Sequence, residues 1–130
     1  MKVNGIDIIS MESKLCLTAK HYSGKKVIFT KTQRELKSKK HSILRDDDFI
    51  SGRLKNAIES PSFVYQDLEK PKSREIVYLE EFMVDNRYRY TKVVLEKKSN
   101  YFFVVSAYRP DFVKERGKTK LIYGKDNAND

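Results

Sequence analysis

The sequence is poor in cysteine and has no long hydrophobic run. Cys16 is the only cysteine among 130 residues, so the chain has neither the paired cysteines of a disulfide framework nor the CxxC spacing of a metal site. The start, MKVNGIDIIS, lacks a long apolar segment, and no stretch approaches the roughly 18 apolar residues needed to cross a bilayer. Internal repeats and low-complexity tracts are missing too. These absences favour a protein of the reducing cytoplasm that has no membrane partner.

Acidic residues are also in short supply. The chain has 27 lysines and arginines against 18 aspartates and glutamates, which gives a formal charge of +9. Such an excess favours association with polyanions, and nucleic acid is the leading class, although many basic proteins bind none. The length fits a single domain over residues 1–130, with residues 1–24 as an N-terminal extension of uncertain structure and residues 124–130 as a polar, disordered tail.

The first half of the chain has the pattern of a strand followed by two helices. Residues 25–30 (KKVIFT) predict a strand, and residues 5–10 are a second, weaker candidate. Thr32 and Glu35 have the spacing of a capping box, which predicts a helix that runs to about Arg45. The aspartates that follow would cap a second helix, which carries apolar residues at helical spacing and ends before Pro61: Asp46, Asp47, Asp48, Ile50, Leu54, Ala57 and Ile58.

The second half has the amino-acid composition of β-strands. Residues 62–67, 75–84, 87–96 and 101–108 are rich in valine, isoleucine, tyrosine and phenylalanine and are separated by turn-forming residues. Asp85 and Asn86 are expected to form a two-residue hairpin loop, and a short last strand is expected at 120–124. The sequence therefore predicts an α+β fold in which an N-terminal strand and two helices pack on an antiparallel β-meander of about four strands.

A histidine and an arginine stand four residues apart in KKHSILRDDD. On one continuous helix, Lys37, His41 and Arg45 would share a face, with Arg34 beside them. One interpretation is a solvated basic face without chemistry. The other is a site for phosphate, because histidine exchanges a proton near neutral pH and arginine can bind a phosphate through two nitrogens.

The order of these segments carries a resemblance. VIFT, HSILR on a helix, AIESPSFVY, YRYTKVVLE and YFFVVSAY together resemble small nucleases of the barnase/EndoU/colicin/RelE-like superfamily, and the phage-associated branch most of all. The similarity spans about residues 27–123. It implies a metal-independent ribonuclease whose motifs match the following residues: His41, Arg45, Ser60, Pro61, Ser106, Ala107 and Tyr108. Asp46 stands where many such sequences have a second histidine.

The chemistry of RNA cleavage needs few groups. RNA supplies its own nucleophile, the 2′-hydroxyl, so an enzyme must remove that proton, protonate the leaving oxygen and neutralise the charge on the phosphorus. His41 is the candidate general base or acid, and Arg45 is the candidate electrostatic clamp. Ser106 or Tyr108 would donate a hydrogen bond or relay a proton, although a tyrosine there also suits a half-buried sheet position. Strand alternation would place both on one face with Phe102 and Val104.

Further cations are candidates for RNA binding. They lie on the predicted helix, on strand 87–96 and in the loop after the last long strand: Arg34, Lys37, Lys40, Arg89, Lys92 and Arg109. Strand alternation puts Arg89 and Lys92 on opposite faces, so one site can use only one of them, and Lys92 is preferred because it shares its face with two tyrosines. His21 has no patterned partner and is expected at the surface. No metal or cofactor is expected, since helix capping explains the aspartates at 46–48.

The sequence thus predicts a small metal-independent ribonuclease of the toxin or phage and mobile-element effector type. Two alternatives stay open. The first is a nucleic-acid-binding module without catalysis, and the second is a protein-interaction module with an acidic partner, such as an antitoxin or inhibitor. All three rely on the same basic surface.

Overall fold

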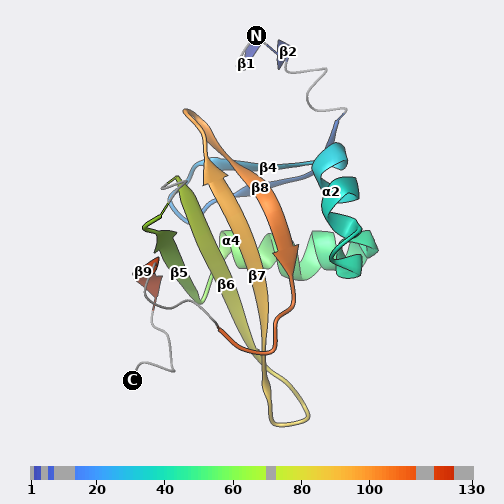
Figure 1. The fold of residues 1–130 in the computed structure, drawn as a ribbon, viewed down its shortest axis with the longest axis vertical. Helices are drawn as coiled ribbons and strands as arrows, with labels where there is room; N and C mark the ends of the chain where they lie inside the picture. The colour runs from blue at the N-terminus through green and yellow to red at the C-terminus, as the bar shows by residue number, and fades with distance from the viewer. Residues whose placement is uncertain (1, 4–5, 8–13, 70–72, 114–118, 125–130) are drawn as a thin grey trace.

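The computed structural model describes residues 2–3, 6–7, 14–69, 73–113 and 119–124. Their centre is one seven-stranded sheet in the order β3-β4-β8-β7-β6-β5-β9 (Figure 1). Its strands are β3 (Leu15–Lys20), β4 (Lys26–Thr30), β5 (Phe63–Asp67), β6 (Arg74–Phe82), β7 (Tyr88–Lys97), β8 (Tyr101–Tyr108) and β9 (Thr119–Gly124). A separate pair joins β1 (Lys2–Val3) to β2 (Ile6–Asp7). The predicted tail covered residues 124–130, but Gly124 belongs to β9. Residues 125–130 and most of the predicted N-terminal extension before residue 14 lie outside the described residues.

The sheet is mixed and larger than predicted. Consecutive strands from β5 to β8 are antiparallel, whereas β4 joins β8 in parallel. The predicted α+β class is confirmed, and so are the strands at 25–30 and 120–124. The predicted antiparallel meander of about four strands is not confirmed as the whole sheet, because β3, β4 and β9 extend both sides of the central strands. The β6–β7 turn also differs from the prediction. Beyond the two strands the N–H of Met83 still donates to the carbonyl of Arg87, so the loop consists of three residues, 84–86, and Asn86 has a φ of 62°.

The predicted helix at 32–45 is wrong in length. Helix α2 covers only Lys31–Ser38, and its cap is Thr30, whose Oγ1 accepts a hydrogen bond of 3.1 Å from the backbone N–H of Gln33. The chain then turns at His41 and continues as a short 3₁₀ helix, η1 (Ser42–Arg45). This change of direction brings Leu44 into the core, where its side chain is fully buried.

The second helical segment agrees with the sequence pattern. Asp46 caps α3 (Asp47–Phe49) by accepting a hydrogen bond of 2.9 Å from the N–H of Asp48. A π-helical turn, η2 (Ile50–Leu54), follows, and then α4 (Lys55–Glu59). The chain leaves the helix at Ser60, one residue before Pro61.

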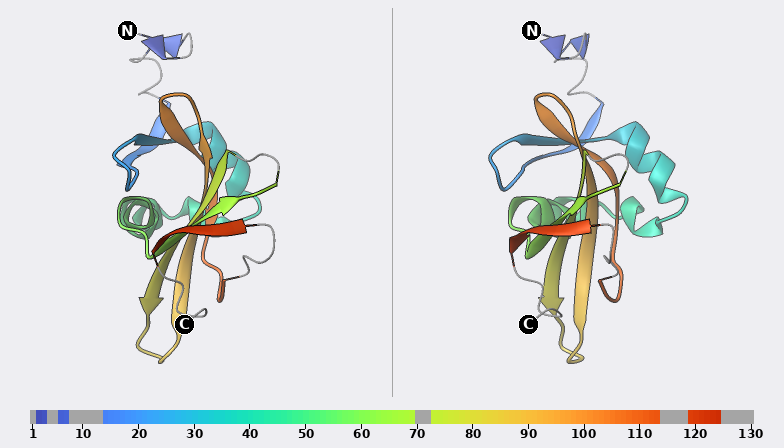
Figure 2. Two further views of the ribbon diagram at one scale, coloured as in Figure 1. Left: turned by 90° about the vertical axis from the view of Figure 1, so that its left-hand side faces the viewer. Right: turned by 60° about the vertical axis from the view of Figure 1, so that its left-hand side comes forward.

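Two hydrophobic clusters lie on opposite faces of the sheet. On one face α4 packs against the strands, as the view along that helix in Figure 2 shows, and the core there is formed by buried residues that include Phe49, Ile50, Leu54, Ala57, Ile58, Val77, Val93 and Leu95. On the other face Phe63, Tyr65, Ile76 and Tyr78 form a smaller aromatic cluster. The sheet is curled enough that the rings of Tyr22, after β3, and Tyr123, in the opposite edge strand β9, lie 4.4 Å apart.

Candidate active site

His41 and Tyr108 are in contact, although 66 residues separate them in the sequence. The two rings are stacked, with centroids 4.5 Å apart and planes inclined by only 7°. His41 is held in extended backbone between α2 and η1, and Tyr108 is the last residue of β8. The site therefore forms where the first helix meets the end of a central strand.

A β-bulge in β8 determines which face of the sheet Tyr108 occupies. Val104 pairs with Leu95, but the next pair is Ser106 with Val94, so Val105 is the extra residue. Phe102 and Val104 are therefore buried in the core under α4, whereas Ser106 and Tyr108 lie on the opposite face. The prediction that these four residues share one face is wrong, because a bulge shifts the alternation by one residue.

Helix α2 stabilises this bulge. The side-chain amide of Gln33 donates a hydrogen bond of 2.7 Å to the carbonyl oxygen of Val105. The backbone N–H of the same glutamine is held by the Thr30 cap. The start of the helix and the irregular point of the strand are thus joined, and this link holds α2 against the strand that presents Tyr108.

Lys92 is the cation that the structure places beside the stacked rings. Lys92 lies in β7 and is the cross-strand partner of Tyr108 in β8 and of Tyr78 in β6. Its Nζ atom lies 5.6 Å from the centroid of the Tyr108 ring and 5.7 Å from that of Tyr78, both within cation–π range. The Tyr108 ring therefore has an imidazole stacked on it and an ammonium group within cation–π range.

A pocket of about 260 Å³ opens next to this group. Its lining combines rings, one cation and one carboxylate: Tyr78, Lys92, Tyr108, Pro110, Asp111 and Phe112. Phe112 is 58% exposed, so an aromatic ring is accessible at the mouth of the pocket. Flat apolar walls next to a cation are suited to an unstacked nucleobase and its phosphate.

The surroundings of His41 favour its neutral form. Partial burial lowers the pKa of His41 below the usual 6.5, and the charges of Lys40 and Lys37 lower it further. A neutral imidazole at physiological pH can accept a proton, which is the property that a general base requires.

Arg45 lies in a different pocket, of about 350 Å³, whose lining is Cys16, Lys31, Arg34, Glu35, Ser38, Leu44 and Arg45. The expected stripe on one helix does not form, because the helix ends at Ser38 and Arg45 follows on a separate 3₁₀ turn. The structure therefore does not bring Arg45 together with the pocket beside Tyr108.

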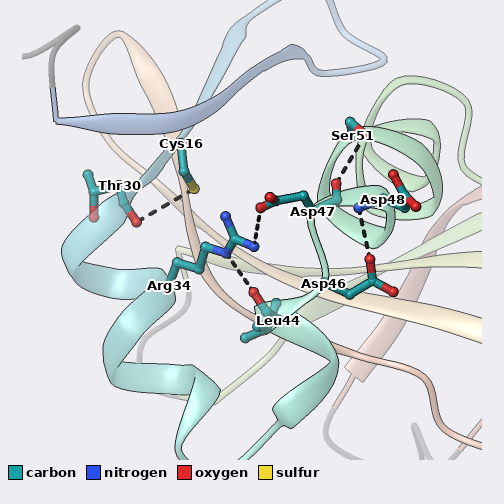
Figure 3. A network of polar contacts seen from close by, with 8 residues as sticks. All are labelled: Cys16, Thr30, Arg34, Leu44, Asp46, Asp47, Asp48 and Ser51. Carbon is teal, nitrogen blue, oxygen red and sulfur yellow. Dashed lines mark hydrogen bonds and ion pairs between the residues drawn. The ribbon is translucent and has the colours of Figure 1, made fainter.

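Arg34 has a structural role in the same region (Figure 3). Its Nη2 lies 2.7 Å from Oδ1 of Asp47, and its Nε donates to the backbone carbonyl of Leu44. These bonds connect α2 to the start of α3. Cys16 lies nearby, with its Sγ 3.8 Å from the carbonyl oxygen of Thr30, and burial raises the pKa of its thiol.

The other predicted RNA-binding cations divide into two groups. Lys37 and Lys40 are near enough to His41 to lower its pKa, and Lys40 is exposed. Arg89 is paired with Asp111, and Arg109 lies 3.8 Å from Glu81, which also receives a hydrogen bond from Arg53. Burial is the main cause of the lowered pKa of Arg109. Arg89 does not line the aromatic pocket, but its partner Asp111 does.

Sequence reasoning did not single out Tyr78, Asp111 or Gln33, and it misplaced His21. His21 is 3% exposed, so the expectation of a surface histidine is wrong. Its Nε2 lies 2.9 Å from Oε1 of Glu75, a partner 54 residues away, and no local sequence signal indicates this pairing.

Comparisons with protein-family models, with curated proteins and with solved structures find no match to this chain. Within residues 14–69, 73–113 and 119–124, no three histidine, cysteine, aspartate or glutamate side chains gather as they would around a metal ion. None of the helices described is long and apolar enough to span a membrane.

Proposed function

We propose that the protein is a small metal-independent ribonuclease that cleaves RNA by attack of the 2′-hydroxyl on the adjacent phosphate. The observation that carries this proposal is the stack of His41 on Tyr108 with the Lys92 ammonium beside the same ring. An imidazole, a hydroxyl and a cation are the three kinds of group that this reaction requires.

Each group has a role that its surroundings support. Because its pKa is lowered, His41 is neutral at physiological pH and takes the proton from the 2′-hydroxyl. Lys92 stabilises the negative charge that develops on the phosphorus oxygens. The hydroxyl of Tyr108, or of Ser106 on the same face of β8, donates a hydrogen bond to the phosphate or relays a proton to the leaving 5′-oxygen.

The RNA strand would be drawn to this point by charge and held by stacking. Lys37 and Lys40 lie beside His41 and attract the phosphates. The base next to the cleaved bond would occupy the pocket between Tyr108 and Phe112. The role of a toxin or of a phage or mobile-element effector rests on the sequence resemblance, and an acidic inhibitor would bind the same basic surface.

A second candidate, a nucleic-acid-binding module without catalysis, is favoured by the position of Arg45. The predicted partner of His41 lines another pocket, so in the proposed reaction Lys92, and not Arg45, stabilises the charge on the phosphorane. A binding module would keep the aromatic pocket and the basic surface but would release no product.

The two candidates are separated by analysing the products. Purified protein is incubated with mixed RNA in EDTA, and the ends are examined for 2′,3′-cyclic phosphate and 5′-hydroxyl groups. The ribonuclease gives both, with a rate that EDTA does not change. Cleavage that EDTA abolishes, or products with 5′-phosphate ends, would contradict the proposed chemistry. Tight binding without any product would favour the binding module.

A further inference from the structure

The turn between β3 and β4 places a serine, a histidine and a glutamate in one hydrogen-bonded row. The Oγ atom of Ser23 lies 2.6 Å from Nδ1 of His21. On the other side of the ring, Nε2 lies 2.9 Å from Oε1 of Glu75 in β6. His21 and Glu75 are both buried, whereas Ser23 is exposed.

The partners of His21 determine where the protons lie. The backbone N–H of Ser23 points to Nδ1 at 3.1 Å, and an amide N–H can only donate, so Nδ1 carries no hydrogen. The carboxylate of Glu75 can only accept, so Nε2 carries the proton. The remaining hydrogen bond must then run from the Ser23 hydroxyl to Nδ1. The imidazole is therefore oriented to take the proton of the serine.

The ring of His21 has little freedom to leave this orientation. It is stacked on Phe102, with centroids 4.1 Å apart and planes inclined by 10°, and Tyr22 lies against it at 4.2 Å. Orientation of a histidine by a buried carboxylate and close packing is the arrangement that activates a serine for nucleophilic attack.

The serine side chain is not needed to close the turn. The backbone N–H of Gly24 already donates to the carbonyl of His21 at 2.7 Å, and the N–H of His21 donates to the carbonyl of Lys25 at 2.7 Å. The bond between the Ser23 hydroxyl and His21 is additional to these two. The turn therefore does not depend on the Ser23 hydroxyl, and a structural role alone does not explain its bond to His21.

A pocket and a cation lie beside this serine. The pocket has a volume of about 490 Å³ and is lined by Lys20, His21, Tyr22, Ser23, Gly24 and Glu59. The Cε atom of Lys20 lies 4.0 Å from the position that a Cβ atom on Gly24 would occupy, so the lysine side chain extends over the turn. Lys20 thus brings a positive charge to the lining of this pocket, and an oxyanion on the carbonyl attacked by Ser23 would carry the opposite charge.

We propose that Ser23 is a nucleophilic serine that accepts the acyl group of small carboxylic esters. Its Oγ atom attacks the carbonyl carbon while His21 takes the hydroxyl proton at Nδ1, and Glu75 stabilises the resulting imidazolium. The ester C–O bond then breaks, the alcohol leaves with the proton from His21, and the acyl group stays on Ser23. Attack by water, with His21 again as base, releases the acid and restores the serine. The site and the reaction are independent of RNA cleavage at His41.

The experiment uses p-nitrophenyl acetate with the full chain and measures nitrophenol release together with peptide mapping of the acetylated residue. The wild type should acetylate Ser23 faster than any other serine. Ser23→Ala should lower the serine-dependent rate by about 10²-fold or more, the usual worth of a positioned catalytic group. Ser51→Ala is the matched control, because Ser51 is also exposed and its hydroxyl donates to the backbone carbonyl of Asp47.

Glu75→Gln tests whether the Glu75 carboxylate activates His21. The change of volume is small, and the amide oxygen can still accept a hydrogen bond from Nε2 of His21. The substitution should lower the acetylation rate of Ser23, and circular dichroism checks that the variant folds. Mapping of the wild type alone decides the proposal if either variant fails to fold. Acetylation of Ser23 at no more than the rate of Ser51 would overturn it, as would an unchanged rate in folded Glu75→Gln. Ser23→Ala should leave RNA cleavage at the wild-type rate.

Discussion

The two histidines of this chain occupy opposite kinds of environment. His41 is half-exposed and is surrounded by lysines and a tyrosine ring, whereas His21 is buried against a phenylalanine and hydrogen-bonded to a carboxylate. The first can approach a polyanion, and among the described residues no carboxylate is recorded in contact with its ring. The second is fixed in position by an acid and closed off from large substrates. The same side chain is thus suited to phosphate chemistry in one region and to orientation or small-molecule chemistry in the other.

The largest expected effect is on catalysis at His41. His41→Ala should lower RNA cleavage by about 10² to 10⁴, because a positioned general acid or base contributes that factor. The fold should persist, since the ring packs on the surface of Tyr108 and not in either core cluster. Single-turnover cleavage of a defined RNA measures the first effect and circular dichroism the second.

The neighbouring Ser42→Ala is the matched control for that variant, because Ser42 is exposed and adjoins the same turn. It should cleave at the wild-type rate. If His41→Ala also cleaves at that rate, His41 is not a catalytic group and the binding module becomes the better account of the site.

At His21 a substitution is expected to lower stability and to leave cleavage unchanged. His21→Ala should lower the free energy of unfolding by about 3 kcal/mol, because it leaves the buried Glu75 carboxylate without its partner. RNA cleavage per folded molecule should stay unchanged at temperatures where the variant is folded. Urea denaturation and cleavage assays on the same preparation measure the two quantities.

A double variant that combines His21→Ala with Glu75→Gln tests whether the unpaired carboxylate causes the loss of stability. A neutral amide costs less to bury unpaired than a carboxylate, so the double variant should regain part of the lost stability. An unfolding free energy for His21→Ala within about 0.5 kcal/mol of the wild type would mean that the pair contributes no more than a surface contact.

The difference between the two histidines also marks what the sequence could predict. Local patterns identified β4 to β9, the capped second helix and its buried face, because hydrophobic periodicity and capping residues act over a few positions, but they did not predict β3. His41 and Tyr108 were named as members of one candidate site, and their rings lie in contact. The pairing of His21 with Glu75 depends on how distant strands fold together, and nothing near either residue indicates it.

Two single-residue irregularities explain most of the remaining errors. A two-residue loop at 85–86 would pair Lys92 with Leu79, whereas the three-residue loop pairs it with Tyr78. Such a shift exchanges the faces of a whole strand. The bulge at Val105 does the same for Ser106 and Tyr108. Arg45 was misplaced because helical spacing was extended beyond Ser38, where the chain turns to bury Leu44.

A smaller effect is expected from the bond that joins α2 to the bulge. Gln33→Ala removes the donor to the Val105 carbonyl and should cost about 1 kcal/mol of stability, the typical net value of a hydrogen bond. Cleavage should fall more than stability alone explains, because Tyr108 follows the bulge. Thr32→Ala, at an exposed neighbouring position, is the control and should change neither. Equal cleavage by Gln33→Ala and wild type would show that the bulge holds Tyr108 without the helix.

The smallest effect is a shift of the pH profile from the lysines beside His41. Lys40 and Lys37 lower its pKa, so Lys40→Glu should raise it, and Lys37→Glu with Lys40→Glu should raise it further. A general base acts in its neutral form, and a higher pKa means that this form is lost at a higher pH as acid is added. The acid limb of the cleavage profile should therefore move to higher pH.

Each phosphate contact that these variants lose should also reduce the slope of log affinity against log salt by about 0.7. Lys55→Glu, on α4, removes the same charge away from His41 and should leave the acid limb in place. A limb that moves equally in all these variants would mean that overall charge, and not the lysines beside His41, sets the proton affinity of the site.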